Sequence, residues 1–274
     1  MSHPSAKATS SIIILLKISA ICLLLGRAWQ HFFWTTPYAV ILPLESGQQI
    51  KYFNTAIGFY LLFGAVLSIF FKGKRNWQFL YLYGVLLIIS FLSVSYWVTK
   101  SYRINQLFEY AIQVGVVWML IKVYDKPINW PSFRQVLKIL IAFTFTAHGL
   151  YALGFPYATP AGFIEMTVKI LQIDEVSASW FLKLFGLLDI LLSIGLFFKP
   201  TAKAALIYAT FWGLATAFAR TLAYYDSLSP LGSLHRWFYE SLQRMPHAIF
   251  PFLLLICCGY YFKSKSKQLN SSAL

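Results

Sequence analysis

Long apolar runs are the feature that most constrains this sequence. Mainly apolar stretches follow one another along the chain, over residues 11–33, 54–71, 77–98, 107–124, 134–154, 180–198, 202–224 and 247–262. A helix of about 20 apolar residues spans the hydrocarbon core of a bilayer, because each residue adds about 1.5 Å to a core about 30 Å thick. The sequence therefore predicts an all-α, polytopic transmembrane bundle of about eight helices.

The composition agrees with a membrane protein. Of the 274 residues, 58% are hydrophobic and 12% are charged, whereas roughly 25% of a typical soluble domain is charged. The formal net charge of +14 does not indicate a nucleic-acid partner, since Lys and Arg are spread over the connections and form no single basic patch. The cysteines form no C-x-x-C motif, which argues against a thioredoxin-like redox pair.

Basic residues alternate between the connections of the chain. They gather in the tails and after the second, fourth and sixth apolar runs, at Lys7, Lys72, Lys74, Arg75, Lys122, Lys126, Arg134, Lys199, Lys203, Lys263, Lys265 and Lys267. Cytoplasmic loops carry such an excess of Lys and Arg. We therefore expect both termini in the cytoplasm, and a multi-pass protein embedded in the lipid of a bacterial inner membrane.

The two halves of the chain resemble each other. Leu-Lys-Ile at 16–18 recurs at 137–139, and Phe-Phe-Lys at 70–72 recurs at 197–199. Since four helices return the chain to the same side, both copies run in the same direction, unlike the inverted repeats of many transporters. We predict two parallel four-helix transmembrane units, the second with longer outer loops, over residues 1–126 and 127–274.

Short motifs close the second and sixth apolar runs. The sixth run ends on a G-x-x-D…G-L-F-F-K-P pattern, carried by Gly186, Asp189, Gly195, Leu196, Phe197, Phe198, Lys199 and Pro200. The second run ends on a weaker version, with Tyr60 or Leu61 where the acid would stand, carried by Gly58, Gly64, Phe70, Phe71 and Lys72.

Together with a polar residue near the outer end of the first helix, these motifs resemble the DoxX-type membrane proteins. The resemblance covers nearly the whole chain as two units. It implies a four-helix membrane fold and a role beside redox enzymes, as in the membrane subunits of thiosulfate:quinone oxidoreductases.

Polar residues inside the apolar runs are candidates for function, because ionisable groups are costly within a membrane. Arg27 and His148 lie 121 residues apart, at equivalent positions of the two halves. An arginine near a helix end can snorkel to the headgroups, but a second polar group at the same depth favours a buried role between helices. The candidate pocket comprises Arg27, His31, Glu109, His148, Asp189 and Arg220.

Asp189 is the most costly of these residues, since it lies near the middle of its run. One interpretation is a structural ion pair or hydrogen bond with Arg27, Arg220 or His148. The other is a proton-accepting carboxylate beside a ligand pocket.

Two outer connections predict amphipathic helices. In 163–171, Glu165 and Lys169 are spaced i, i+4, and in 235–247 Arg236, Glu240 and Arg244 are each four residues apart. Each helix is either a solvated surface helix with ordinary ion pairs or a lid over a pocket that attracts an anion. The outer-loop candidates are Glu45, Glu165, Lys169, His235, Arg236, Glu240, Arg244 and His247.

No motif assigns an enzymatic reaction. The histidines show no H-x-x-x-H or H-E-x-x-H spacing, so we predict no metal site, and G-x-S-x-G, P-loop and G-x-G-x-x-G patterns are absent. The sequence names no catalytic residue and no cofactor; a quinone is the cofactor that the resemblance implies.

Three functions remain open. The favoured one is a redox-associated, quinone-interacting membrane subunit with a polar pocket near the outer face and a membrane or extracytoplasmic redox partner. The alternative is a non-catalytic membrane partner or scaffold protein. A transporter of small solutes or anions is less well supported, since the predicted repeats are not inverted and the inner half of each helix is largely apolar.

Overall fold

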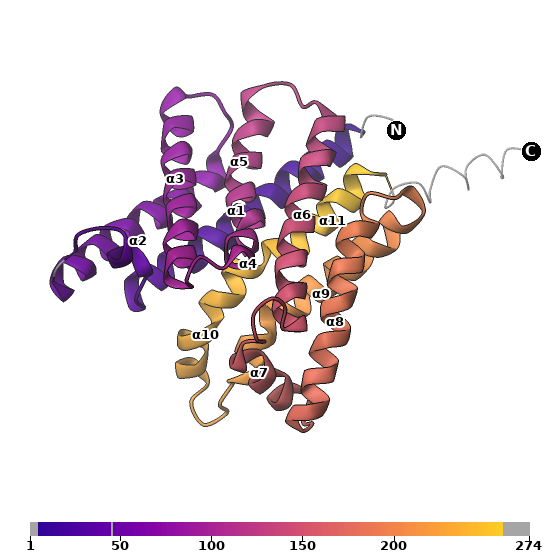
Figure 1. The fold of residues 1–274 in the computed structure, drawn as a ribbon. Coiled ribbons are helices and arrows are strands. Elements are labelled where there is room, and N and C mark those ends of the chain that lie inside the picture. Colours follow the sequence, from indigo (N-terminus) through magenta and orange to yellow (C-terminus); the bar gives the residue numbers. More distant parts are fainter. Residues whose placement is uncertain (1–4, 45, 260–274) are drawn as a thin grey trace, which may run out of the picture.

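A computed structural model describes residues 5–44 and 46–259 as a bundle of helices (Figure 1). Within these ranges there is no strand, so the predicted all-α class is confirmed. Besides the 3-10 helix η1 (Pro37–Val40), the elements are α1 (Ala6–Phe33), α2 (Gly47–Phe70), α3 (Asn76–Thr99), α4 (Ile104–Glu109), α5 (Ala111–Asp125), α6 (Trp130–Leu153), α7 (Ala161–Leu171), α8 (Glu175–Gly195), α9 (Lys199–Ala223), α10 (Pro230–Arg244) and α11 (Pro246–Cys257).

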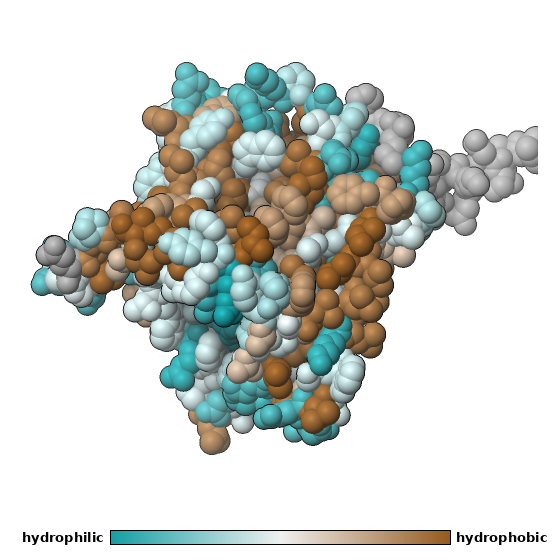
Figure 2. Space-filling model, in the orientation of Figure 1, coloured by the Kyte–Doolittle hydropathy of each residue, from teal (hydrophilic) through white to brown (hydrophobic). Residues whose placement is uncertain are grey.

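In the described part of the chain, seven helical segments are long and apolar enough to cross a membrane: α1, α2, α3, α4 together with α5, α6, α8 and α9. The predicted run 247–262 corresponds to α11, and its last residues, 260–262, lie outside the described residues. Large apolar side chains such as Leu80, Leu87 and Phe211 are exposed, as suits a surface in contact with lipid. Figure 2 shows brown apolar residues between teal polar ends of the bundle. The chain is a multi-pass helical membrane protein.

Local signals account for several helix ends. Ser46 and Gln49 form a capping box at the start of α2, in which each side chain bonds the other's backbone N–H. The Asn129 side chain accepts from the Ser132 N–H at 3.2 Å at the start of α6. Gly154 ends α6 with a φ of 74°, a left-handed conformation that glycine adopts without steric cost.

The helices pack in a pattern that repeats along the chain. α1 packs along α2, and α6 packs along α8. α3 contacts α5, and α9 contacts α11, while α1 meets α11 and α6 meets α5. Finally, α10 crosses onto α1, and α4 crosses onto α6. Four central helices, α1, α5, α6 and α11, therefore connect the two halves of the molecule.

The two ends of the bundle differ in their connections. In Figure 1 the start of α1 and the end of α11 lie at the same end as the α5–α6 and α8–α9 connections, and α7 and α10 lie at the opposite end. We call the first the basic end, since its connections carry Lys126 and Lys199. The amphipathic helices predicted over 163–171 and 235–247 are α7 and α10, so both predictions are confirmed as helices.

Two glycines let α6 and α8 approach closely. A Cβ placed on Gly149 would lie 2.7 Å from the Gly186 carbonyl oxygen, and one placed on Gly186 would lie 2.8 Å from the Gly149 carbonyl oxygen. Small residues at such crossings allow membrane helices to pack backbone against backbone. This contact brings together the segment of α6 that carries His148 and the segment of α8 that carries Asp189.

Candidate functional site

A polar cavity of about 630 Å³ lies between α1, α4, α5, α9 and α10. Six cationic side chains line it, from Arg27, Lys100, Arg103, Arg220, Arg236 and Arg244, together with two carboxylates, from Glu109 and Glu240. Aromatic and amide groups complete the walls, among them Tyr96, Tyr110, Gln113 and Tyr239. The lining therefore carries a formal excess of four positive charges.

Arg27 is 2% exposed and reaches the polar cavity from α1. Its Nε and Nη2 donate to the Gln113 Oε1 at 3.2 and 2.5 Å, and its Nη1 donates to the Gln30 Oε1 at 2.7 Å. The guanidinium also lies over the Tyr110 ring, 5.0 Å from its centroid. Among the described residues no carboxylate pairs with Arg27, so amides and a ring hold its charge. Its buried position agrees with the predicted role between helices.

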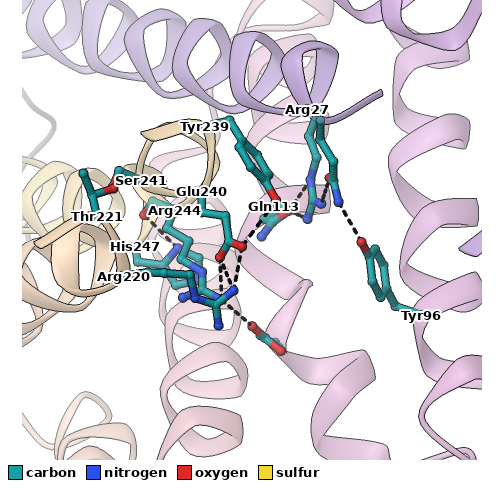
Figure 3. Close-up of polar contacts among 12 residues, drawn as sticks. Arg27, Tyr96, Gln113, Arg220, Thr221, Tyr239, Glu240, Ser241, Arg244 and His247 are labelled. Atoms are coloured by element: carbon teal, nitrogen blue, oxygen red, sulfur yellow. Dashed lines mark hydrogen bonds and ion pairs between the residues drawn. The ribbon is translucent and has the colours of Figure 1, made fainter. Parts of the chain in front are cut away.

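Both carboxylates of the polar cavity are already paired. The Arg220 Nη1 lies 2.6 Å from both carboxylate oxygens of Glu240. Arg244 lies 3.8 Å from Glu240, which fits the predicted i, i+4 pair, and 3.7 Å from Glu109 (Figure 3). Arg220, Glu240, Arg244 and Glu109 thus form a continuous chain of alternating charge across one wall.

A second, apolar cavity of about 300 Å³ lies between α6, α7, α8 and α9. Its walls are mainly apolar side chains, including Phe163, Met166, Ile170, Phe181 and Leu182. Its polar groups include those of His148, Asp189, Trp212, Arg244 and His247. Arg244 and Phe163 line both cavities, so they form the partition between the two.

Asp189 is 3% exposed and faces the apolar cavity from α8. Its carboxylate accepts from the Tyr208 hydroxyl at 3.2 Å and from the Trp212 indole N–H at 3.3 Å. Tyr208 and Trp212 lie one turn apart on α9 and therefore share a helix face. Among the described residues neither an ion pair nor a hydrogen bond joins Asp189 to Arg27, Arg220 or His148, so the first of the two interpretations, a pair with one of these residues, is wrong. A phenol and an indole take the place of a cation.

Two histidines face each other at the apolar cavity. The rings of His148 and His247 are 5.4 Å apart in an edge-to-face arrangement. The Nδ1 of His247 donates to the Arg244 carbonyl oxygen at 2.8 Å, and its buried Nε2 has no partner in the described residues. Since Nδ1 is the donor, the neutral ring presents Nε2 as an acceptor.

The structure separates residues that the sequence grouped into one pocket. Arg27, Glu109 and Arg220 line the polar cavity, whereas His148 and Asp189 line the apolar one. The candidate pocket is therefore two cavities, because residues at one depth on different helices face different ways.

His31 belongs to neither cavity. Its Nδ1 donates to the Arg27 carbonyl oxygen at 2.6 Å, and its Nε2 accepts from the Tyr38 hydroxyl at 3.0 Å. This buried ring therefore ties the end of α1 to η1 and is structural, which corrects its placement in the pocket.

Three further outer-loop candidates lie in different places: one on the surface, one at the polar cavity and one outside the described residues. His235 is exposed among the rings of Trp29, Phe33 and Trp34. Arg236 lines the polar cavity from α10. Glu45 lies outside the described residues.

Glu165 and Lys169 form the predicted exposed pair on α7. The Lys169 Nζ lies 2.8 Å from the Glu165 Oε1. This hydrogen bond lowers the pKa of the Glu165 carboxyl and raises the pKa of the Lys169 amine. Both side chains point away from the apolar cavity, which α7 covers with its opposite face.

Sequence reasoning missed several residues of both cavities. Gln113 was visible as a polar residue inside an apolar run, and Lys100 and Arg103 as basic residues on a connection expected to be poor in them. Tyr208 and Trp212 gave no comparable signal, since aromatic residues are frequent throughout this chain.

No group of three or more His, Cys, Asp or Glu side chains in the described residues is arranged to hold a metal ion. Comparison of the chain with known protein families, with characterised proteins and with solved structures gives no match.

Proposed function

We propose that the chain is a tandem pair of DoxX-like four-helix units. The packing supports this proposal, because each contact in the first half has a counterpart in the second, with α1, α2, α3 and α5 matching α6, α8, α9 and α11. Lys17 donates to the Ile69 carbonyl oxygen at the end of α2, and Lys138 lies over the Phe197 ring just beyond the end of α8.

In this proposal the two units differ most where α2 and α8 carry Tyr60 and Asp189. Tyr60 stacks on Tyr81, with ring centroids 4.2 Å apart, and each hydroxyl donates to the other's carbonyl oxygen. Tyr208 stands 127 residues after Tyr81, and there it donates to Asp189. The first unit therefore has a tyrosine pair near the position where the second unit has a carboxylate beside a cavity.

We propose that the apolar cavity binds a quinone ring and that the protein is a redox-associated membrane subunit. Asp189 carries this proposal: a buried carboxylate at the edge of an apolar cavity, with no ion pair to any described residue. A volume of about 300 Å³ fits a single ring, at the lower end of the range for small-ligand sites (roughly 300–1,000 Å³). The apolar wall formed by α7, α8 and α9 suits the ring's tail and the surrounding lipid.

The polar groups of the apolar cavity suit the carbonyls of such a ring. A bound quinone would supply two-electron, two-proton chemistry, with the electrons coming from a partner redox protein. Asp189 in its protonated form would donate a hydrogen bond to one carbonyl, and the unpaired Nε2 of His247 would accept one from a hydroxyl. Trp212 offers an aromatic face beside Asp189.

The orientation is part of the same proposal. The start of α1 and the end of α11 lie at the basic end (Figure 1), which the positive-inside rule places in the cytoplasm. Both cavities then lie in the outer half of a bacterial inner membrane, within reach of an extracytoplasmic redox partner.

A binding measurement with D189N tests the quinone proposal. The full-length protein in lipid nanodiscs is titrated with a short-chain ubiquinone and a menaquinone analogue. We expect D189N to weaken binding about tenfold, because it keeps the size of the side chain but replaces one of the two oxygens that accept from Tyr208 and Trp212 with an N–H2 donor. E165Q makes the same chemical change on the outer face of α7 and should leave binding unchanged. If neither analogue binds and D189N alters only yield or complex assembly, the quinone site is wrong and the protein is a scaffold.

A further inference from the structure

We propose that the polar cavity is a second ligand site, which binds a phosphate-bearing anion. This site is separate from the proposed quinone site, because its lining comes mainly from α1, α4, α5 and α10 and not from α8. The ligand chemistry follows from three observations: the charge of the walls, the surroundings of Arg27, and the aromatic surface beside them.

The walls of the polar cavity carry more positive charges than the carboxylates of the cavity can pair with. Both carboxylates of the polar cavity are committed to Arg220 and Arg244. Arg27, Lys100, Arg103 and Arg236 then remain without a carboxylate among the described residues. Like charges gathered in a partly enclosed cavity repel one another and lose hydration, so an anion entering from outside would be stabilised by several of them together.

Arg27 is the most deeply buried of these unpaired cations, so an anion would stabilise it the most. A buried guanidinium without a counter-charge is unfavourable, and neutral amide oxygens are its hydrogen-bond acceptors here. Gln113 (Figure 3) and Gln30 hold the guanidinium plane in place. A guanidinium fixed in this way is prepared for bidentate contact with a planar or tetrahedral oxyanion.

A phosphate monoester fits the excess charge better than a carboxylate does. A monoester carries about 1.5 to 2 negative charges on three oxygens at neutral pH, whereas a carboxylate carries a single one. The cations are spread over α1, the α3–α4 connection and α10, so three oxygens can meet donors from several elements. The rings of Tyr96, Tyr110 and Tyr239 line the same cavity and offer an apolar surface to the organic part of the ester.

The phosphate can come from a soluble ester or from a lipid headgroup. We test both sources with the full-length protein in phosphatidylcholine nanodiscs. One arm titrates phenyl phosphate, with citrate as the carboxylate comparison. The other arm measures retention of phosphatidic acid through purification. Binding of phenyl phosphate assigns a soluble ester, and selective retention of phosphatidic acid assigns a lipid headgroup; either supports the proposal if the variants below change it.

Three variants and a control decide whether the cavity is responsible. R27M should weaken phosphate binding about tenfold or more, since it removes the fixed guanidinium. The double variant K100Q/R236Q changes two exposed side chains, and it should also weaken binding. E240Q should strengthen binding severalfold, because it frees Arg220. R75M removes an exposed arginine at the basic end and should change nothing.

Three results would overturn the proposal. The first is the absence of binding in both arms. The second is phosphate binding that K100Q/R236Q and E240Q leave at the level of the unmodified protein. The third is citrate binding in place of phosphate binding, which would reject phosphate as the ligand class. None of these results depends on the quinone measurement, because Asp189 does not line the polar cavity.

Discussion

The two cavities share a partition but have opposite characters. The polar cavity has six cationic side chains around two paired carboxylates, and the apolar cavity has one carboxylate bonded to a phenol and an indole. Arg27 on α1 lines the polar cavity, and His148 on α6 lines the apolar one. A guanidinium held by amide oxygens therefore lies on one side of the partition, and a carboxylate held by a phenol and an indole lies on the other.

The largest effect is expected on stability, when the amide that holds Arg27 in the polar cavity is removed. Q113L removes the oxygen that accepts from both Nε and Nη2 of Arg27. Leaving such buried donors unpaired costs about 1–3 kcal/mol, and more for a charged group. We expect the variant to unfold at a lower temperature in detergent, and we expect phenyl phosphate to restore part of the loss.

A matched substitution checks that prediction. Q48L makes the same change at an exposed glutamine that bonds the Tyr52 hydroxyl, and its unfolding temperature should stay close to that of the unmodified protein. Equal unfolding temperatures for Q113L and Q48L would show that Gln113 does not stabilise the buried guanidinium of Arg27.

The partition between the cavities should give an intermediate effect. R244Q breaks the ion pairs with Glu109 and Glu240 and removes a cation that lines both cavities. We expect phosphate affinity to fall about tenfold and quinone affinity to fall by less than that, because ionic contacts contribute more to an anion than to a neutral ring. Parallel titrations measure the two changes. An equal loss for both ligands would mean that the cavities act as one site.

The sequence predicted the helices and the depth of their polar residues, but not the direction each polar residue faces. Apolar length alone indicates a membrane helix, so Arg27, His148 and Asp189 were expected at depth. One interpretation paired Asp189 with Arg27, Arg220 or His148, yet it bonds Tyr208 and Trp212 on α9. The reason is geometric. Gly149 and Gly186 bring α8 against α6, and the depth of a residue along its helix does not reveal which helix it packs against.

The smallest effect is expected on the face of α7 that points away from both cavities. K169Q removes the partner of Glu165, so the pKa of Glu165 should rise toward its ordinary value. The pairing contributes above the ordinary pKa of the carboxyl and is lost as the pH falls through the lowered pKa. NMR titration of the Glu165 carboxyl measures this shift, while both ligand affinities should remain unchanged. A change in either affinity would show that this face takes part in a site.

The most direct test of two separate sites measures both ligands on both key variants. R27M and D189N are each titrated with phenyl phosphate and with the short-chain ubiquinone, in the same nanodiscs. We expect R27M to weaken phosphate binding about tenfold or more and to leave quinone binding unchanged, and we expect D189N to weaken quinone binding about tenfold and to leave phosphate binding unchanged. Loss of both ligands in both variants, from protein that remains folded by circular dichroism, would contradict two independent cavities.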